Sequence, residues 1–151
     1  MKFVHNNEIT DPSVNLAIEE FLLRYLTSEP ELVLFYINEP SVIIGRNQNS
    51  IEEVDPDFIQ ENKINVVRRL SGGGAVYHDH GNLNFSYISG AAENLHNYHH
   101  FINPVVDALN KLGVPAELKG KSDVFVDGKK ISGNAQYASC LLYTSPSPRD
   151  A

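Results

Sequence analysis

Apolar residues recur at helical spacing near the start of the chain. Asp11-Pro12 has the form of a helix start, because aspartate caps free backbone amides and proline suits the first helical position. Glu19, Glu20 and Arg24 are expected on a solvated face. The spacing predicts one apolar face, formed by Val14, Ala17, Ile18, Phe21, Leu22 and Tyr25.

Short apolar runs between turn signals predict strands. Residues 32–37 form a nearly continuous apolar run, which is typical of a buried strand, and residues 42–44 are expected as its neighbour. Asp55-Pro56 predicts a second, short helix that reaches Asn62. Further strands are predicted at residues 66–67, 75–77 and 83–87.

The second half of the chain predicts one helix and one hairpin. Apolar residues from Phe101 to Leu112 indicate a helix closed by Gly113, which either begins or bends at Pro104. Residues 124–131 predict a two-residue hairpin, because Asp127-Gly128 tolerates the positive backbone angles of such a turn. Helices and strands are mixed without the strict alternation of a doubly wound sheet.

Composition narrows the class of protein. The 151 residues are 42% hydrophobic, which is enough for one domain with a sizeable core. A formal charge of −7 gives no support to a nucleic-acid binder. The single cysteine, Cys140, excludes internal disulfides and cysteine-rich zinc sites. No apolar run approaches the ~20 residues of a membrane span and no secretory signal is evident, so a cytoplasmic protein is expected.

The densest chemical signal is the segment from Arg68 to Asp79. Three consecutive glycines let a ligand approach backbone amide donors, and Arg69 can hold an oxyanion through its planar fork. In isolation, such a glycine run also fits a plain turn. The segment lacks the GK[ST] ending of a P-loop and the spacing of a dinucleotide fingerprint. It predicts an anion site of another kind.

Several separated motifs resemble the lipoate-protein ligase family. They are Arg-Arg-x-Ser-Gly-Gly-Gly-Ala-Val-Tyr-His-Asp at 68–79, Gly81-Asn82, and the segments 45–49, 121–123 and 130–135. The resemblance implies an incomplete α+β fold of the biotin and lipoate ligase superfamily: a mixed, largely antiparallel sheet flanked by helices, related to the class II aminoacyl-tRNA synthetase core.

The resemblance also implies a domain organisation. Residues 1–139 are expected to form the amino-terminal part of the catalytic domain, since family ligases continue with further strands and usually a small accessory domain. Residues 140–151 form a polar Ser/Pro tail, which we expect to be disordered or artefactual.

The same resemblance implies the site residues. Lys130 and Arg69 would be catalytic, Asp123 would lie near the adenylate or its metal, and Leu16, Phe35, Val76 and Phe85 would line an acyl tunnel. The implied substrate- and ATP-binding set is Arg69, Ser71, Gly72, Gly73, Gly74, Ala75, Val76, Tyr77, His78, Asn82, Asp123, Lys130, Ser132, Gly133 and Ala135.

The implied activity is ATP-dependent conversion of lipoate to lipoyl-AMP, with Mg²⁺, followed by transfer to a protein lysine. The expected partners are lipoyl domains of 2-oxoacid dehydrogenase E2 proteins and the glycine cleavage H protein. Because the first step brings two anions together, it requires fixed cations, which Lys130 and Arg69 can supply. The alternatives are an octanoyl or lipoyl transferase of the same superfamily and an inactive ligand-binding fragment.

Overall fold

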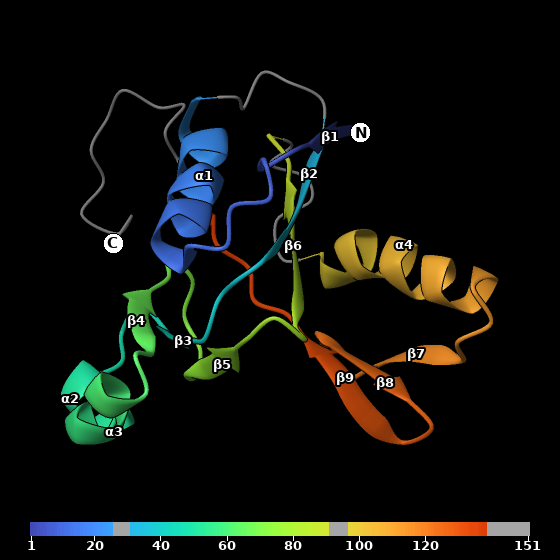
Figure 1. Cartoon of the computed structure of the whole chain (residues 1–151). Helices are drawn as coiled ribbons and strands as arrows, with labels where there is room; N and C mark the ends of the chain where they lie inside the picture. Colours follow the sequence, from blue (N-terminus) through green and yellow to red (C-terminus); the bar gives the residue numbers. More distant parts are fainter. Residues whose placement is uncertain (26–30, 91–96, 139–151) are drawn as a thin grey trace. The chain divides into compact units, whose positions relative to one another are not determined.

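The computed structural model describes residues 1–25, 31–90 and 97–138 (Figure 1). The chain divides into two compact units. Unit 1 comprises Met1–Gly90 and Tyr137–Ala151, and unit 2 comprises Ala91–Gln136. The predicted tail, including Cys140, lies outside the described residues.

Unit 1 contains two three-stranded sheets. The first has the order β1-β2-β6, with β1 (Lys2–Val4), β2 (Leu32–Ile37) and β6 (Leu83–Ile88). The second has the order β4-β3-β5, with β4 (Asn65–Arg68), β3 (Ser41–Ile44) and β5 (Val76–His78). The expectation that residues 42–44 would pair with residues 32–37 is wrong. Both edges of β2 are taken by β1 and β6, so β3 pairs with β4 and β5 instead.

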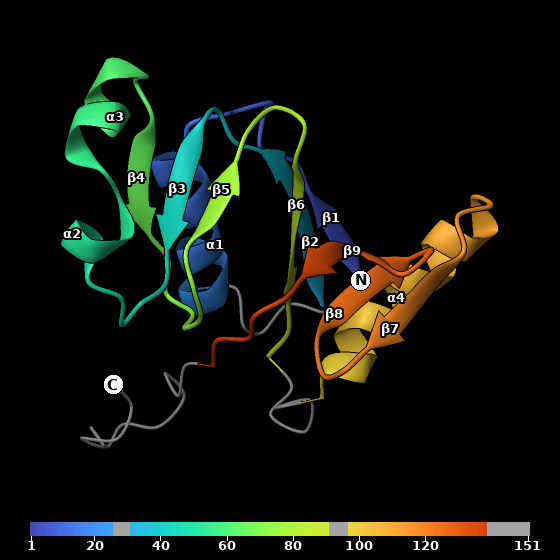
Figure 2. The same ribbon diagram turned by 90° about the horizontal axis from the view of Figure 1, so that it is seen from below.

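Helix α1 (Pro12–Tyr25) contacts β4 and β6, one strand of each sheet, and lies behind the strands in Figure 2. It begins where predicted, since Asp11 Oδ1 accepts hydrogen bonds from the backbone amides of Ser13 and Val14. Leu22 packs against buried side chains of the first sheet. That core consists of Leu22, Leu32, Leu34, Tyr36 and Ile88.

The predicted apolar face of α1 is confirmed only in part, because Ile18 and Leu22 pack on the core but other members do not. Val14, Phe21 and Tyr25 are 39%, 55% and 68% exposed, whereas Asn15 is fully buried. Glu19, expected in water, instead accepts hydrogen bonds from Tyr36 of β2 and Ser86 of β6. A sheet surface that offers hydroxyl donors can accept a polar stripe of the helix, because the buried polar groups are then paired.

The two short helices of unit 1 follow cap signals. They are α2 (Ser50–Glu53) and α3 (Pro56–Glu61). The Asn49 side chain caps α2, and the Asp55 carboxylate caps α3 by accepting from two backbone amides. Because α3 ends at Glu61 with Asn62 as its cap residue, the prediction from Asp55-Pro56 is confirmed.

Unit 2 is one helix on a three-stranded meander. Its elements are α4 (Tyr98–Lys111), β7 (Ala116–Lys119), β8 (Asp123–Val126) and β9 (Lys129–Gly133), and its core is Ile102, Ala116 and Val124. The helix starts at the Asn97 cap, so Pro104 lies inside it. Asp127 and Gly128 have φ values of 49° and 76°, which confirms the predicted hairpin turn.

The strand pairing confirms an α+β fold with a mixed, largely antiparallel arrangement. Among the described residues, β1 pairs with β2 and β3 with β4 in parallel, and the other four pairings are antiparallel. Among the described residues, no helix has both the length and the apolar character needed to span a membrane.

Candidate functional site

The loop between β4 and β5 carries the three glycines and is packed tightly against the end of β3. Arg69 N donates to Ile44 O at 2.9 Å, and Arg46 N donates to Ser71 O at 3.0 Å. A Cβ at Gly45 would lie only 2.0 Å from the Gly73 carbonyl oxygen. The sequence therefore needs glycine at position 45 as well as in the loop, because the two backbones are in direct contact.

The two arginines that precede the glycines differ in their partners. Arg68 Nη1 donates to the carbonyl oxygens of Gly45, Arg46 and Gln48 at 2.8, 3.1 and 2.7 Å. Its hydrogen bonds fasten the segment after β3 to the end of β4. Arg68 is therefore a structural clamp, which the sequence motif did not reveal.

Arg69 is turned toward the glycine loop itself. Its Nη2 donates to the Gly72 and Gly74 carbonyls at 3.0 and 2.8 Å. Its Nε is buried and has no hydrogen-bond partner among the described residues. Burial lowers the pKa of Arg69 and nearby Tyr36 opposes that shift, but a guanidinium keeps its charge. Arg69 thus holds a fixed positive charge, and its buried Nε donor is unused among the described residues.

A polar network missed by the sequence analysis lies between α1 and the first sheet. Tyr36 Oη donates to Glu19 Oε1 at 2.6 Å, and Ser86 Oγ donates to the same oxygen. Burial raises the pKa of Glu19, although both hydrogen bonds oppose the shift. Burial, and then the charge of Glu19, also raise the pKa of Tyr36, which therefore stays a neutral donor. Glu19 lies one helical turn from Asn15 and from Leu22, both buried, so the three share one face of α1; of these, only the spacing from Leu22 was visible in the sequence.

Asn84 adds a second unused donor to unit 1. It lies opposite Tyr36 in the β2–β6 register, and its Oδ1 accepts from Asn82 Nδ2 at 2.9 Å. Its Nδ2 is buried without a partner in the part of the chain that the structure describes. The charge of Arg69 also acts on Tyr36, where it lowers the pKa against the larger effects of burial and Glu19. Asn84 Nδ2 and Arg69 Nε are thus two buried donors that could each serve an oxygen-bearing ligand.

The other residues of the predicted binding set in this region lie in the glycine loop, on β5 and just before β6. Gly72, Gly73, Gly74, Val76 and Tyr77 are exposed, and Ser71, Ala75, His78 and Asn82 are partly buried. His78 Nδ1 lies 3.1 Å from Asn38 Nδ2. Burial and the charge of Arg69 lower the pKa of His78, against an opposing effect of Asp79. His78 therefore senses the charge of Arg69, although its pairing with Ser41 places it at the end of β5 away from the glycine loop.

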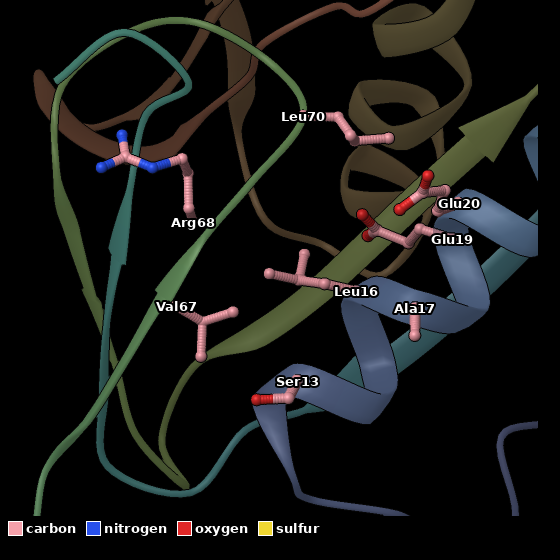
Figure 3. Close-up of a pocket in the computed structure, with 8 residues that line it drawn as sticks. All are labelled: Ser13, Leu16, Ala17, Glu19, Glu20, Val67, Arg68 and Leu70. Carbon is pink, nitrogen blue, oxygen red and sulfur yellow. The ribbon is translucent and has the colours of Figure 1, made fainter.

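A separate cavity of about 180 Å³ lies between α1 and β4 (Figure 3). Its volume is below the ~300 Å³ typical of small-molecule pockets. Of the predicted tunnel residues, Leu16 lines it, whereas Phe35, Val76 and Phe85 do not. The Arg68 guanidinium points away from the α1 side chains in Figure 3. The lining is Ser13, Leu16, Ala17, Glu19, Glu20, Val67, Arg68 and Leu70.

The β8–β9 hairpin of unit 2 brings together a second group of predicted residues. Lys130 Nζ forms an ion pair with Asp123 Oδ2 at 3.0 Å, with the lysine side chain 52% exposed. A Cβ at Gly133 would lie 3.2 Å from Lys130 Cε, so the lysine stem passes closely over the glycine. Ser132 lies opposite Val124 in the register, and Ala135 is exposed. Lys130, Asp123 and Gly133 thus form one cluster.

The cation-binding potential of the hairpin is small. Asp123 already pairs with Lys130. Within residues 1–25, 31–90 and 97–138, no group of three or more His, Cys, Asp or Glu could hold a metal ion. A divalent cation would therefore need most of its ligands from a bound phosphate.

The motifs in both units fall inside one family match. The model of the lipoyl protein ligase A/B catalytic domain matches residues 11–140. The chain belongs to this family. It is 56% identical over 140 residues to lipoate-protein ligase LplJ of Bacillus subtilis, covering 92% of this chain and 42% of that protein. The chain thus spans less than half the length of this relative.

Solved structures of ligases share the fold. A bipartite lipoate protein ligase of Thermoplasma acidophilum, studied with its E2 lipoyl domain, matches with 35% identity and a TM-score of 0.77, over 89% of this chain and 54% of that chain. A lipoate-protein ligase A bound with ATP matches with 33% identity and a TM-score of 0.71, over 88% and 57%. These similarities confirm the resemblance drawn from the motifs.

Proposed function

We propose that the complete protein converts lipoate and ATP to lipoyl-AMP and then transfers the lipoyl group to a lysine of a carrier domain. The observation that carries this proposal is Arg69, a fixed cation with a buried Nε that has no partner among the described residues. A carboxylate or phosphoryl oxygen would satisfy that donor. The name of the Bacillus subtilis relative and the ATP-bound structure support the same chemistry.

In the first step, a lipoate carboxylate oxygen attacks the α-phosphorus of ATP. The new bond is a mixed anhydride, and the bond to the β-phosphate oxygen breaks to release pyrophosphate. Two anions meet, so positive charge must be present before they react. In the proposal Arg69 supplies it from the glycine loop and Lys130 from the hairpin, while loop amides from Gly72 to Gly74 hold ligand oxygens.

In the second step, a neutral lysine amine of the carrier attacks the lipoyl carbonyl. An amide forms, AMP leaves with the electron pair of the broken anhydride bond, and the amine loses a proton to solvent. The expected carriers are E2 lipoyl domains and the glycine cleavage H protein. The archaeal ligase studied with its E2 lipoyl domain supports this class of partner.

Mg²⁺ would neutralise charge on the departing pyrophosphate when bound. In the proposal, Asp123 is the candidate residue for contacting the metal ion. Its ion pair with Lys130 leaves only part of its capacity to accept further contacts. The phosphates themselves are the main oxygen ligands that Mg²⁺ uses in such sites.

The test is to incubate the complete protein with lipoate and ATP and to look for lipoyl-AMP by mass spectrometry. We expect the adenylate and pyrophosphate in equal amounts before any carrier is added. The rival is an octanoyl or lipoyl transferase of the same superfamily. Transfer from an acyl-carrier thioester, with no adenylate formed from free acid and ATP, would establish that rival instead.

A further inference from the structure

His78 lies at the end of a chain of side-chain amides, defined as Asn6, Asn15 and Asn38. Asn6 Nδ2 donates to Asn15 Oδ1 at 3.0 Å, and Asn15 Nδ2 donates to Asn38 Oδ1 at 2.9 Å. Asn38 Nδ2 then lies 3.1 Å from His78 Nδ1. Asn15 and Asn38 are fully buried, so each of their polar groups needs a partner.

Backbone groups fix the direction of this amide chain. Glu8 N donates to Asn6 Oδ1 at 3.2 Å, and the Ile9 carbonyl accepts from both Asn6 Nδ2 and Asn15 Nδ2 at 2.9 Å. A carbonyl only accepts, so the amide nitrogens of Asn6 and Asn15 must face it. The second N–H of Asn15 then reaches the oxygen of Asn38. The nitrogen of Asn38 is left to face the histidine.

This direction determines where the histidine carries its proton. The Asn38 NH₂ group can only donate, so His78 Nδ1 has to accept with its lone pair. A proton on Nδ1 would set two donors against each other beside a buried amide. The neutral ring must then carry its proton on Nε2. Burial and the charge of Arg69 also lower the pKa of His78, and the opposing effect of Asp79 is smaller. These effects together favour the neutral ring.

We propose that the amide chain fixes His78 as the neutral Nε2–H tautomer, so that this histidine can meet a ligand oxygen only as a hydrogen-bond donor. No described residue accepts a hydrogen bond from Nε2, which leaves that N–H for a carboxylate or phosphoryl oxygen. His78 is then neither a general base nor a cation for phosphate. Asn15 and Asn38 are positioning residues. The donor role rests on the proposed function, but the tautomer does not.

The test is nitrogen NMR of the complete, ligand-free protein labelled with ¹⁵N-histidine. His78→Gln identifies the ring signals by their disappearance. At pH 7 we expect Nδ1 to resonate as an unprotonated nitrogen and Nε2 as an N–H nitrogen, in a single tautomer. A tautomer mixture, a proton on Nδ1 or a charged ring at that pH would overturn the proposal. No substrate is present, so this result is independent of the adenylate assay.

A substitution of Asn38 sharpens the test. Asn38→Asp replaces the donor with a negatively charged acceptor of the same shape, so Nδ1 should gain a proton and the pKa of His78 should rise above that of the wild type. Asn7→Asp is the matched control, since Asn7 is exposed and contacts His5 instead. Unchanged His78 signals in folded Asn38→Asp would refute the proposal. If that variant does not fold, the wild-type spectrum decides.

Discussion

The two predicted catalytic cations, Arg69 beside the glycine loop and Lys130 in the β8–β9 hairpin, are held in different ways. Arg69 is bound to two loop carbonyls, and its Nε is buried. Lys130 is about half exposed and has one ion pair, to Asp123. A partly buried charge acts in a lower effective dielectric than an exposed one. Arg69 is therefore the preorganised cation, whereas Lys130 is the adaptable one.

The largest expected effect is at Arg69. In the complete protein, Arg69→Ala should reduce the rate of lipoyl-AMP formation by about 10²–10³-fold, as for loss of a preorganised donor. Arg69→Lys should recover only part of the rate, because an ammonium lacks the planar fork. The rate of pyrophosphate release measures adenylate formation in both variants. A wild-type rate for Arg69→Lys would mean that charge alone matters.

The next prediction concerns Lys130, the more exposed of the two cations. We expect Lys130→Ala to slow adenylate formation by about 10²-fold. Stability should change by less than ~1 kcal/mol, because the lost ion pair is exposed. Lys129→Ala is the matched control, since Lys129 is the exposed neighbour on the same strand. Equal rates for the two variants, with both folded, would remove Lys130 from the site.

Gly73 tests whether the loop holds Arg69 in place. Gly73 has φ +103°, and an added Cβ would lie 2.9 Å from Arg69 Nη2. Gly73→Ala should lower the free energy of unfolding by about 1–3 kcal/mol. Gly72→Ala, which meets nothing within 4 Å, should change it by less than ~0.5 kcal/mol. Urea unfolding compares the pair, and equal stabilities would argue against a tightly determined loop.

The smallest expected effect is on the pH dependence of stability, through the polar network of Glu19, Tyr36 and Ser86 between α1 and the first sheet. Burial raises the pKa of Glu19 from its usual 4.5, so above that pH the ionised carboxylate costs stability in the folded state only. That cost is absent in acid, where the group is protonated in both states. Glu19→Gln should therefore raise the free energy of unfolding at pH 8 but not at pH 4.

The matched control for the pH experiment is Glu20→Gln. Glu20 forms an exposed ion pair with Arg24, 2.6 Å long, and does not touch the sheet hydroxyls. Its substitution should lower the free energy of unfolding at pH 8 by less than ~1 kcal/mol, opposite in sign to Glu19→Gln, because only an exposed ion pair is lost. If Glu19→Gln behaved like Glu20→Gln, the desolvation of Glu19 would be disproved.

Local signals in the sequence predicted the elements that depend on local chemistry. Asp55-Pro56 marks the start of α3, and Asp127-Gly128 marks the hairpin turn, because both act on neighbouring backbone. The anion site at the glycine run and Arg69 stays a prediction, to which the structure adds the unused Nε donor.

Features that depend on distant partners could not be predicted in this way. Helical periodicity placed Phe21 inside and Glu19 outside, because it carries no information that Tyr36 and Ser86 would offer hydroxyls. The role of Arg68 depends on three carbonyls some 20 residues away in the chain. The assignment of β3 to the second sheet depends on which strands already flank β2.

The most direct test of the central claim is a crystal structure of the complete protein with a non-reactive lipoyl-AMP analogue. The proposed function predicts that the Arg69 guanidinium and the Lys130 ammonium both lie within hydrogen-bond distance, about 3.2 Å or less, of oxygens around the acyl-phosphate linkage. A bound analogue that contacts only one of these cations would contradict the claim that two separate segments serve the same reacting group.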